Sequence, residues 1–158
     1  MFSDYALRIL LYLGANPAPE ASKPPSLMDI SRAYGISFHH LSKVAHKLTL
    51  LGYLQAQRGR TGGLRLARPP SEIGIGRLVR ETEPHFHIVE CFDLEHNDCP
   101  IVSACGLTRP LHEAQQAFLA CLDRYTLADA LGRPDKLIPL WSLKRQIKSK
   151  GSTPSGKD

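Results

Sequence analysis

Residues 34–54 read YGISFHHLSKVAHKLTLLGYL and place a turn between two helical patterns. The residues before the turn, 27–34, predict one short helix, and Gly35 can adopt the positive φ with which such a helix ends. Ser37 then stands where an N-cap is needed. Apolar residues recur after it and predict a second helix over residues 38–51, with a buried side made of Leu41, Val44, Leu48 and Leu51. Two short helices joined in this way indicate a helix-turn-helix unit.

The opposite face of the second helix carries hydrogen-bond donors and no acidic residue. Its side chains can donate to phosphates or base edges, and they are Ser37, His39, His40, Ser42, Lys43, His46 and Lys47. A helix face that is merely solvated normally mixes Asp or Glu with its Lys residues. The composition therefore favours a face that contacts nucleic acid.

A β-hairpin is expected directly after this helix. Residues 53–56 and 64–67 have the pattern of two short strands around the tip RGRTGG, residues 58–63. The tip lacks the GxGxxG and Walker lysine patterns of nucleotide-binding loops, so we interpret it as the wing of a winged helix, followed by a short helix over residues 75–82. The arginines in and beside the tip suit a narrow minor groove, and they are Arg58, Arg60, Arg65 and Arg68.

The net charge of +5 on the 158 residues is unevenly distributed. Residues 1–80 contain 11 Lys/Arg and 4 Asp/Glu, residues 81–140 contain 4 and 10, and residues 141–158 contain 5 and 1. The basic first half indicates a polyanionic partner such as DNA, although scattered solvated charge is an alternative interpretation. No apolar run approaches the length of about 18 residues that a membrane span needs. The start MFSD lacks the pattern of a secretory signal, so we expect a cytoplasmic protein with no membrane partner.

Three of the four cysteines, Cys91, Cys99 and Cys105, fall on one short segment, whereas Cys121 lies apart on an apolar helical stripe. The spacing differs from the Cys-x2-Cys pairs of zinc fingers and ribbons, so a closed zinc site would need unusual loops and a further ligand. Three thiolates at wider spacing fit an iron–sulfur cluster whose fourth ligand comes from elsewhere. A cluster-free thiol switch or a zinc site is the alternative.

A long helix is predicted from Thr108, which we expect to act as its cap, with Pro110 in its first turn. Its apolar seam contains Leu111, Ala114, Phe118, Cys121, Leu122 and Tyr125. Such a helix has few partners within a small winged-helix domain, so we expect it to pair two copies of the chain in a homodimer, as a two-fold DNA operator requires. At the other end of the chain we expect a helix that starts at Asp4, with Ser3 as its cap.

The expected fold is therefore mainly α with a small β-hairpin wing, that is, a winged helix-turn-helix plus a long dimerisation helix. The DNA-binding domain is expected over residues 1–83, and the cluster loop with the dimerisation helix over residues 84–131. Residues 132–158 form a C-terminal tail, and its end from residue 151 is rich in Ser, Gly and Lys and is expected to be disordered.

In these features the chain resembles the NsrR group of nitric-oxide-sensing, iron–sulfur, winged-helix repressors, relatives of IscR and of rhizobial iron regulators. The matching segments span most of residues 3–131: SDYALR at 3–8, residues 34–54 quoted above, RGRTGGLRLAR at 58–68, VECF at 89–92, Cys99, Cys105 and YTLAD at 125–129. The resemblance implies that residues 37–43, with Ser37, His39, His40 and Lys43, enter the major groove of an operator. It implies that the wing, with Arg58 and Arg60, enters the minor groove.

The same resemblance implies that Cys91, Cys99 and Cys105 bind the cluster. In some members the fourth ligand is an aspartate near the N-terminus of the partner subunit, and Asp4 occupies the matching position. In IscR it is a histidine, and here Thr108 stands at that position, which argues against the IscR arrangement. Whether the cluster is 2Fe–2S or 4Fe–4S is not decided by the sequence.

We thus expect a homodimeric transcriptional repressor without enzymatic activity that releases its operators when nitric oxide reacts with the cluster. The segment between Cys91 and Cys105 is expected to rest against the recognition helix. Two alternatives of different kinds are a regulator of the same fold that senses iron or cluster supply, and an electron-transfer protein. The latter is disfavoured because no substrate motif accompanies the cysteines.

Overall fold

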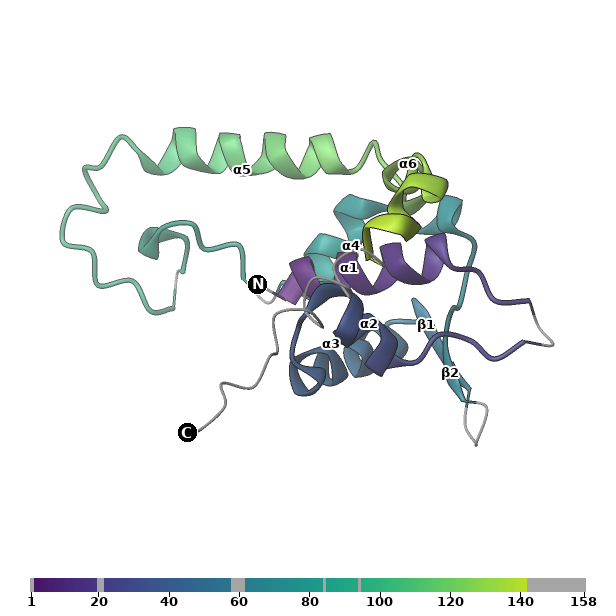
Figure 1. The fold of residues 1–158 in the computed structure, drawn as a ribbon. Helices are drawn as coiled ribbons and strands as arrows, with labels where there is room; N and C mark the ends of the chain where they lie inside the picture. Colours follow the sequence, from purple (N-terminus) through teal and green to yellow (C-terminus); the bar gives the residue numbers. More distant parts are fainter. Residues whose placement is uncertain (1, 20–21, 58–61, 84, 94, 142–158) are drawn as a thin grey trace, which may run out of the picture.

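The structure is a computed structural model and describes residues 2–19, 22–57, 62–83, 85–93 and 95–141. Its labelled helices are α1 (Phe2–Ala15), α2 (Leu27–Tyr34), α3 (Phe38–Leu50), α4 (Ile75–Thr82), α5 (Thr108–Leu122) and α6 (Leu127–Leu131), and its strands are β1 (Leu54–Gln57) and β2 (Gly63–Leu66). Residues 134–141, which were expected in the C-terminal tail, are helical as well. Short 3-10 turns lie at Pro70–Glu72 and Glu90–Phe92. Figure 1 shows α1 to α4, α6 and the hairpin gathered in one body, from which α5 extends outward. The expected fold class, mainly helical with a small hairpin, is confirmed.

The helix-turn-helix unit forms where the sequence predicts it. Ser26 and Asp29 make a reciprocal capping box at the start of α2, and the helix ends at Gly35 with a φ of 69°. Ser37 precedes α3 in the N-cap position, but its side chain makes no capping hydrogen bond. The predicted buried side of α3 holds for three of its four residues, because Leu51 lies just beyond the helix and is only half-buried.

The start of α1 differs from the prediction. The helix begins at Phe2, so Ser3 lies inside it and is buried rather than acting as its cap. The Ser3 hydroxyl shares a hydrogen bond of 2.7 Å with the Thr82 hydroxyl. The Glu83 carboxylate accepts from the Ser3 backbone amide at 2.9 Å, so an acid from the end of α4 takes the place of a local cap.

The wing is a two-stranded antiparallel hairpin in which Leu54 pairs with Leu66 and Gln57 with Gly63. Both strands lie one residue closer to the tip than predicted, since 53–56 and 64–67 were expected and the strands are 54–57 and 63–66. Leu54 and Leu64 face the common core with apolar side chains of α1, α3 and α4. The tip arginines Arg58 and Arg60 lie outside the described residues, as does the C-terminal end expected to be disordered.

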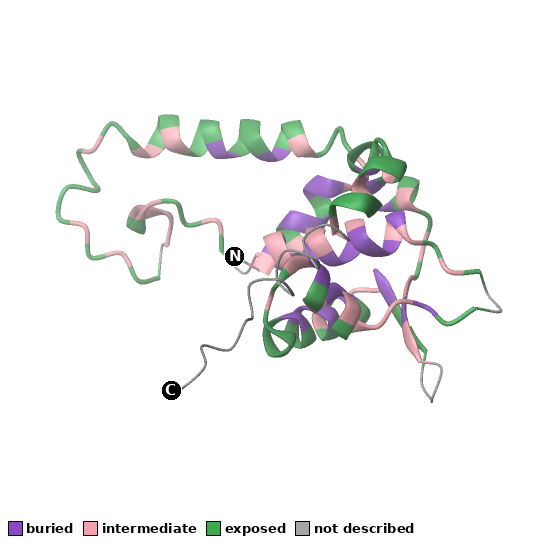
Figure 2. Ribbon diagram, viewed as in Figure 1, coloured by how far each residue is buried: buried purple, intermediate pink, exposed green. Residues whose placement is uncertain are grey.

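Helix α5, which extends from the body, is largely exposed, as Figure 2 shows. Only Gln115 and Leu119 of α5 are buried. Thr108 is its first helical residue, and Leu107 holds the cap position, so the predicted cap is displaced by one residue. Most of the predicted apolar seam is exposed in the single chain, and Phe118 keeps 54% of its surface accessible.

The last turn of α5 is fastened to α4. The Arg80 guanidinium donates to both carboxylate oxygens of Asp123, at 2.5 and 2.7 Å. Gly76 lies so close to Asp123 that an added Cβ would meet its Oδ1 atom at 2.1 Å. Among the described residues, no helix is both long and apolar enough to span a membrane.

Candidate functional site

The exposed face of α3 presents the side chains that the sequence singled out. Leu41, Val44 and Leu48 are buried against the body of the domain, and this packing turns the residues between them outward. Ser37, His39, His40 and Lys43 are all exposed. The His40 ring stacks on Tyr5 of α1 with ring centroids 6.3 Å apart, and His39 lies 6.3 Å from His40. The first turn of α1 therefore lies beside the predicted DNA-contacting face.

Lys47, which the sequence placed on the same face, points elsewhere. Its Nζ atom donates to the Thr82 carbonyl at 3.2 Å and lies 5.0 Å from the centre of the Phe2 ring. The side chain thus joins α3 to the ends of α1 and α4. Helical spacing alone could not show this, because Lys47 stands at the edge of the polar face and next to the buried Leu48.

The two arginines beside the wing tip are directed into the domain rather than outward. Arg65 donates to main-chain carbonyls between α1 and α2. Arg68 lies 4.9 Å from the centre of the Tyr53 ring and donates to the Gly52 carbonyl at 2.8 and 3.1 Å. Of the basic groups that the sequence assigned to this region, only those of the tip are left for DNA, and they fall outside the described residues.

The cysteine segment, residues 85–93 and 95–107, connects α4 to α5 and carries three half-buried free thiols, Cys91, Cys99 and Cys105. Cys91 and Cys105 line one hollow of about 950 Å³, together with Thr108 and His112. The Cys91 sulfur lies 3.7 Å from the Thr108 hydroxyl. Cys99 does not line this hollow, so the single chain brings two of the three predicted ligands together.

The cysteine segment extends away from the helix-turn-helix unit in Figure 1 and does not lie against α3 of its own chain, contrary to expectation. It is held instead against the middle of α5, where the Gln115 side-chain amide donates to the Phe86 carbonyl at 2.5 Å. Farther out, Asp93 lies between His87 and His96, with nitrogen–oxygen distances of 3.6 and 3.3 Å. The segment is therefore ordered by contacts within itself and with α5.

Asp4 lies on the first turn of α1 and is not among the residues that line the hollow. Its carboxylate accepts a hydrogen bond of 2.8 Å from the Nε atom of Arg8, and this bond raises the pKa of the guanidinium. Arg8 in turn lies 5.5 Å from the centre of the Tyr34 ring. Asp4 is half-buried, and 29% of its side-chain surface stays exposed beside Arg8.

The donor set is compatible with an iron–sulfur cluster. Three free thiols stand on one segment, and thiolate is the ligand that such clusters prefer. Within the described residues, no three His, Cys, Asp or Glu side chains already stand together as a metal site. Binding would therefore have to draw Cys99 toward the hollow that Cys91 and Cys105 share.

The chain was compared with known families and structures. The profile of the Rrf2 family, described as an iron-dependent transcriptional regulator, matches residues 2–133. The HTH-type transcriptional regulator NsrR of Geobacillus kaustophilus is 50% identical over 130 residues, which are 82% of this chain and 86% of that protein. The NsrR protein of Bacillus subtilis is 44% identical over 143 residues, covering 90% and 96%. The structure of CymR, the global cysteine regulator of B. subtilis, superposes with a TM-score of 0.63 at 27% identity, covering 84% of this chain and 94% of that one.

Proposed function

Because this chain belongs to the Rrf2 family of transcriptional regulators, we propose that it is a homodimeric repressor whose operator binding depends on an iron–sulfur cluster and ends when nitric oxide reacts with it. The observation that carries this proposal is the set of three free, half-buried thiols on one segment beside a winged helix-turn-helix domain. The relatives named NsrR, which share up to 50% of their residues with this chain, support the signal and the cofactor.

The residues assigned to the cluster are Cys91, Cys99 and Cys105, with Asp4 of the partner subunit as the fourth ligand. When bound, the cluster supplies iron atoms to which nitric oxide can coordinate. Thr108 stands at the position of the IscR histidine, and its hydroxyl lies 3.7 Å from the Cys91 sulfur. In this proposal Thr108 is not a ligand, because a neutral hydroxyl is a poorer ligand for iron than a carboxylate. The partial exposure of the Asp4 side chain is compatible with a ligand that is given to another chain, and an oxygen ligand would be more easily displaced from iron than a thiolate.

In this scheme the DNA contacts come from the exposed side chains of α3, Ser37, His39, His40 and Lys43, and from Arg58 and Arg60 of the wing. Release of Asp4 would free the first turn of α1, which touches α3 through Tyr5 and His40. It also touches Lys47 of α3 through the Phe2 ring. A coupling of roughly 3 kcal/mol between the two sites lowers operator affinity about 100-fold.

A second function has one observation in its favour. The family description names iron, so the same fold and the same ligands would also serve a regulator that responds to iron or cluster supply. The two functions differ in what removes the protein from DNA. Nitric oxide added to the cluster-loaded protein releases the operator in the first case, whereas in the second only loss of the cluster does so.

The test uses anaerobically purified protein and single Ser replacements of the cysteines. Wild type should bind iron and absorb visible light, and Cys91→Ser, Cys99→Ser and Cys105→Ser should each lose most of the iron. Cys121→Ser is the matched control and should keep it, because Cys121 is exposed on α5 and outside the cysteine segment. Equal iron content in wild type and the three variants would overturn the ligand assignment.

The same preparations test the fourth ligand and the signal. Asp4→Ala should keep part of the cluster but alter its spectrum and its rate of reaction with nitric oxide. If Asp4 serves only as a helix ion pair with Arg8, its replacement changes stability by a few tenths of a kcal/mol and leaves the spectrum alone. Operator binding that survives nitric oxide but not cluster removal would favour the iron-supply function.

A further inference from the structure

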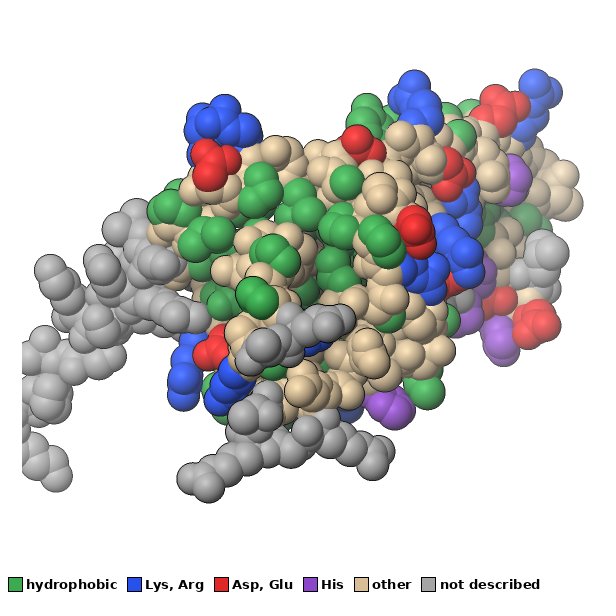
Figure 3. All heavy atoms as spheres, turned by 90° about the vertical axis from the view of Figure 1, so that its right-hand side faces the viewer, with side chains coloured by type: hydrophobic (Ala, Val, Ile, Leu, Met, Phe, Trp, Pro, Cys, Tyr) green, Lys and Arg blue, Asp and Glu red, His purple; other side chains and the backbone are tan. Residues whose placement is uncertain are grey.

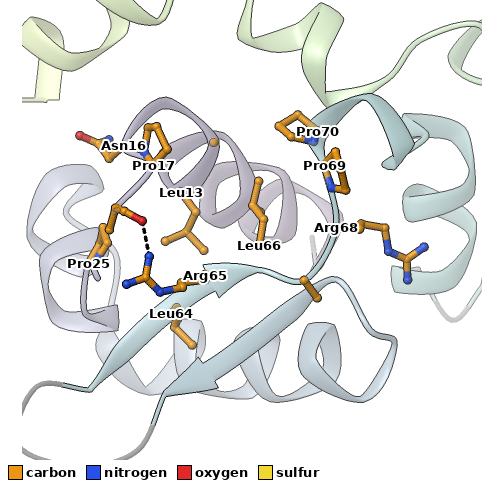
Figure 4. A pocket seen from close by; sticks show the side chains of 13 residues that line it. Leu13, Asn16, Pro17, Pro25, Leu64, Arg65, Leu66, Arg68, Pro69 and Pro70 are labelled. Atoms are coloured by element: carbon orange, nitrogen blue, oxygen red, sulfur yellow. Dashed lines mark hydrogen bonds between the residues drawn. The ribbon is translucent and has the colours of Figure 1, made fainter. Parts of the chain in front are cut away.

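The connection between α1 and α2, residues 16–19 and 22–26, lies against the wing strand β2 and is joined to it by one side chain. The Arg65 guanidinium donates to the Ala18 carbonyl, to the Pro19 carbonyl at 3.0 Å and to the Ser22 carbonyl at 2.8 Å. Figure 4 shows a second pocket, between α1, this connection and β2, with the Arg65 side chain turned across it toward the connection and one of the hydrogen bonds drawn. These bonds join residues more than 40 positions apart in sequence.

Two further contacts tie the same strand to the same connection. The backbone amide of Leu64 donates to the Pro25 carbonyl at 2.9 Å. Gly63 lies so close that an added Cβ would meet the Pro24 carbonyl oxygen at 2.5 Å and the Pro25 carbonyl oxygen at 2.8 Å. The outer edge of β2 is therefore paired with a stretch that contains four prolines. Figure 3 shows apolar side chains gathered on a face of the molecule. The pocket that Arg65 lines has apolar residues in its wall, among them Leu13, Leu66, Pro17 and Pro25.

An isolated two-stranded hairpin is marginally stable in water, and each four-residue strand of the wing buries only one residue, Leu54 or Leu64, in the core. A further contact is therefore needed to hold the outer part of the wing. On β1 the side chains of Gln55 to Gln57 are exposed, so little packs on that strand beyond Leu54. We propose that the α1–α2 connection is this support, and that Arg65 is a positioning residue that sets the angle at which the wing meets DNA. The proposal rests on the proposed minor-groove role of the wing.

The planar guanidinium is the part that makes this joint possible. Arg65 reaches three carbonyls from one side chain, which a lysine ammonium cannot do with the same geometry. Because its donors are directed at these carbonyls, Arg65 acts on DNA through the wing and not by its own phosphate contact. A basic residue next to a DNA-binding wing would ordinarily be assigned to the phosphate backbone, and the two roles give different salt dependences.

The test measures DNA affinity as a function of salt, on a duplex that the wild-type protein selects from a random-sequence library. Arg65→Lys keeps the positive charge but removes the planar guanidinium and its set of directed N–H donors. Gly63→Ala adds a methyl group that pushes β2 away from Pro24 and leaves Arg65 in place. Each variant should bind about 10-fold more weakly, the loss expected for one or two hydrogen bonds, with the salt slope unchanged. Lys43→Gln is the control for a true phosphate contact and should lower the slope by about one.

Two more measurements make the outcome decisive. In a background that carries Arg58→Ala and Arg60→Ala, Arg65→Lys should cost little further affinity, because its effect passes through the wing tip. Hydrogen exchange of the β1 and β2 amides should be faster in Arg65→Lys than in wild type, while the α4 amides are unchanged. Three results would each overturn the proposal. They are an unaltered exchange rate of the wing amides, a salt slope lowered by one in Arg65→Lys, and an Arg65→Lys effect that stays 10-fold in the double-alanine background. Faster wing exchange in a protein that does not bind DNA at all would place the failure in the proposed function and not in the joint.

Discussion

Replacing Gly76 by alanine tests how α5, and with it the cysteine segment, is attached to the DNA-binding domain. Gly76 is buried on α4 and faces the last turn of α5. A Cβ at this position would stand 2.1 Å from the Asp123 Oδ1 atom and 2.8 Å from the Asp123 backbone nitrogen. The carboxylate can rotate away, but the backbone nitrogen cannot, so the end of α5 has to move as a whole.

The magnitude follows from three contributions. Forcing a methyl group into a packed contact costs about 1–3 kcal/mol. Breaking the Arg80–Asp123 pair adds little, because both side chains are more than a third exposed. The better helix propensity of alanine returns up to about 1 kcal/mol. With the propensity gain set against the overpacking cost, the net destabilisation is about 1–2 kcal/mol, which lowers the melting temperature of a chain of this size by roughly 2–8 °C.

Thermal unfolding of the cluster-free protein, followed by circular dichroism, measures this change without interference from bound iron. Gly106→Ala is the matched control, since nothing lies within 4 Å of a Cβ added there and its stability should stay within about 0.5 kcal/mol of wild type. If Gly76→Ala melted at the temperature of Gly106→Ala, the contact between α4 and α5 would not be the one described, and the reasoning would fail.

Three other substitutions probe two contacts that join α4 to the rest of the domain. Tyr53→Phe removes a hydroxyl that donates to Glu81 at 2.6 Å and should cost about 1 kcal/mol in urea unfolding; a second replacement, Glu81→Gln, should then add little. The hydrogen bond from the Ser3 backbone lowers the pKa of Glu83 below its ordinary value of 4.5, so its stabilisation is present above that pH and is lost as the pH falls through the lower folded value. The stability difference between wild type and Glu83→Gln should therefore be largest near neutral pH and shrink in acid, and a difference that did not vary with pH would show that the Ser3 contact is not made.

The helix-turn-helix was predictable because its signals are local. Helix α2 has its predicted limits, and Gly35 adopts the predicted positive φ, because only neighbours within a few residues decide these features. Helix α4 also has its predicted limits. The cap of α1 was wrong because Glu83, 80 residues away, supplies the acceptor that Ser3 was expected to provide locally. Local rules could not reach that contact.

Long basic side chains mark the limit of prediction within the candidate site. Arg65, Arg68 and Lys47 all lie next to exposed polar positions, and each was grouped with the DNA-contacting residues for that reason. All three direct their charged groups to main-chain carbonyls of the domain. Such a side chain can swing several ångströms from its Cα, so its position in the sequence does not fix where its charge lies. The short His39, His40 and Ser37 side chains are exposed as predicted.

The cysteine segment and α5 are both incompletely covered in the single chain, which the apolar seam of α5 indicated for the helix but nothing local indicated for the thiols. Helix α5 buries only two of its residues, and a helix of its 15 residues is marginal in water without tertiary packing. Phe118 and Leu107 stay 54% and 64% exposed. The segment it carries brings Cys91 and Cys105 to one hollow and leaves Cys99 outside it. In the proposed dimer, a second copy that packs along α5 covers its apolar seam, and the partner's Asp4 completes the ligand set of the thiols. We therefore expect stability and cluster binding to rise together with protein concentration, and the ligand set to be completed only in the pair.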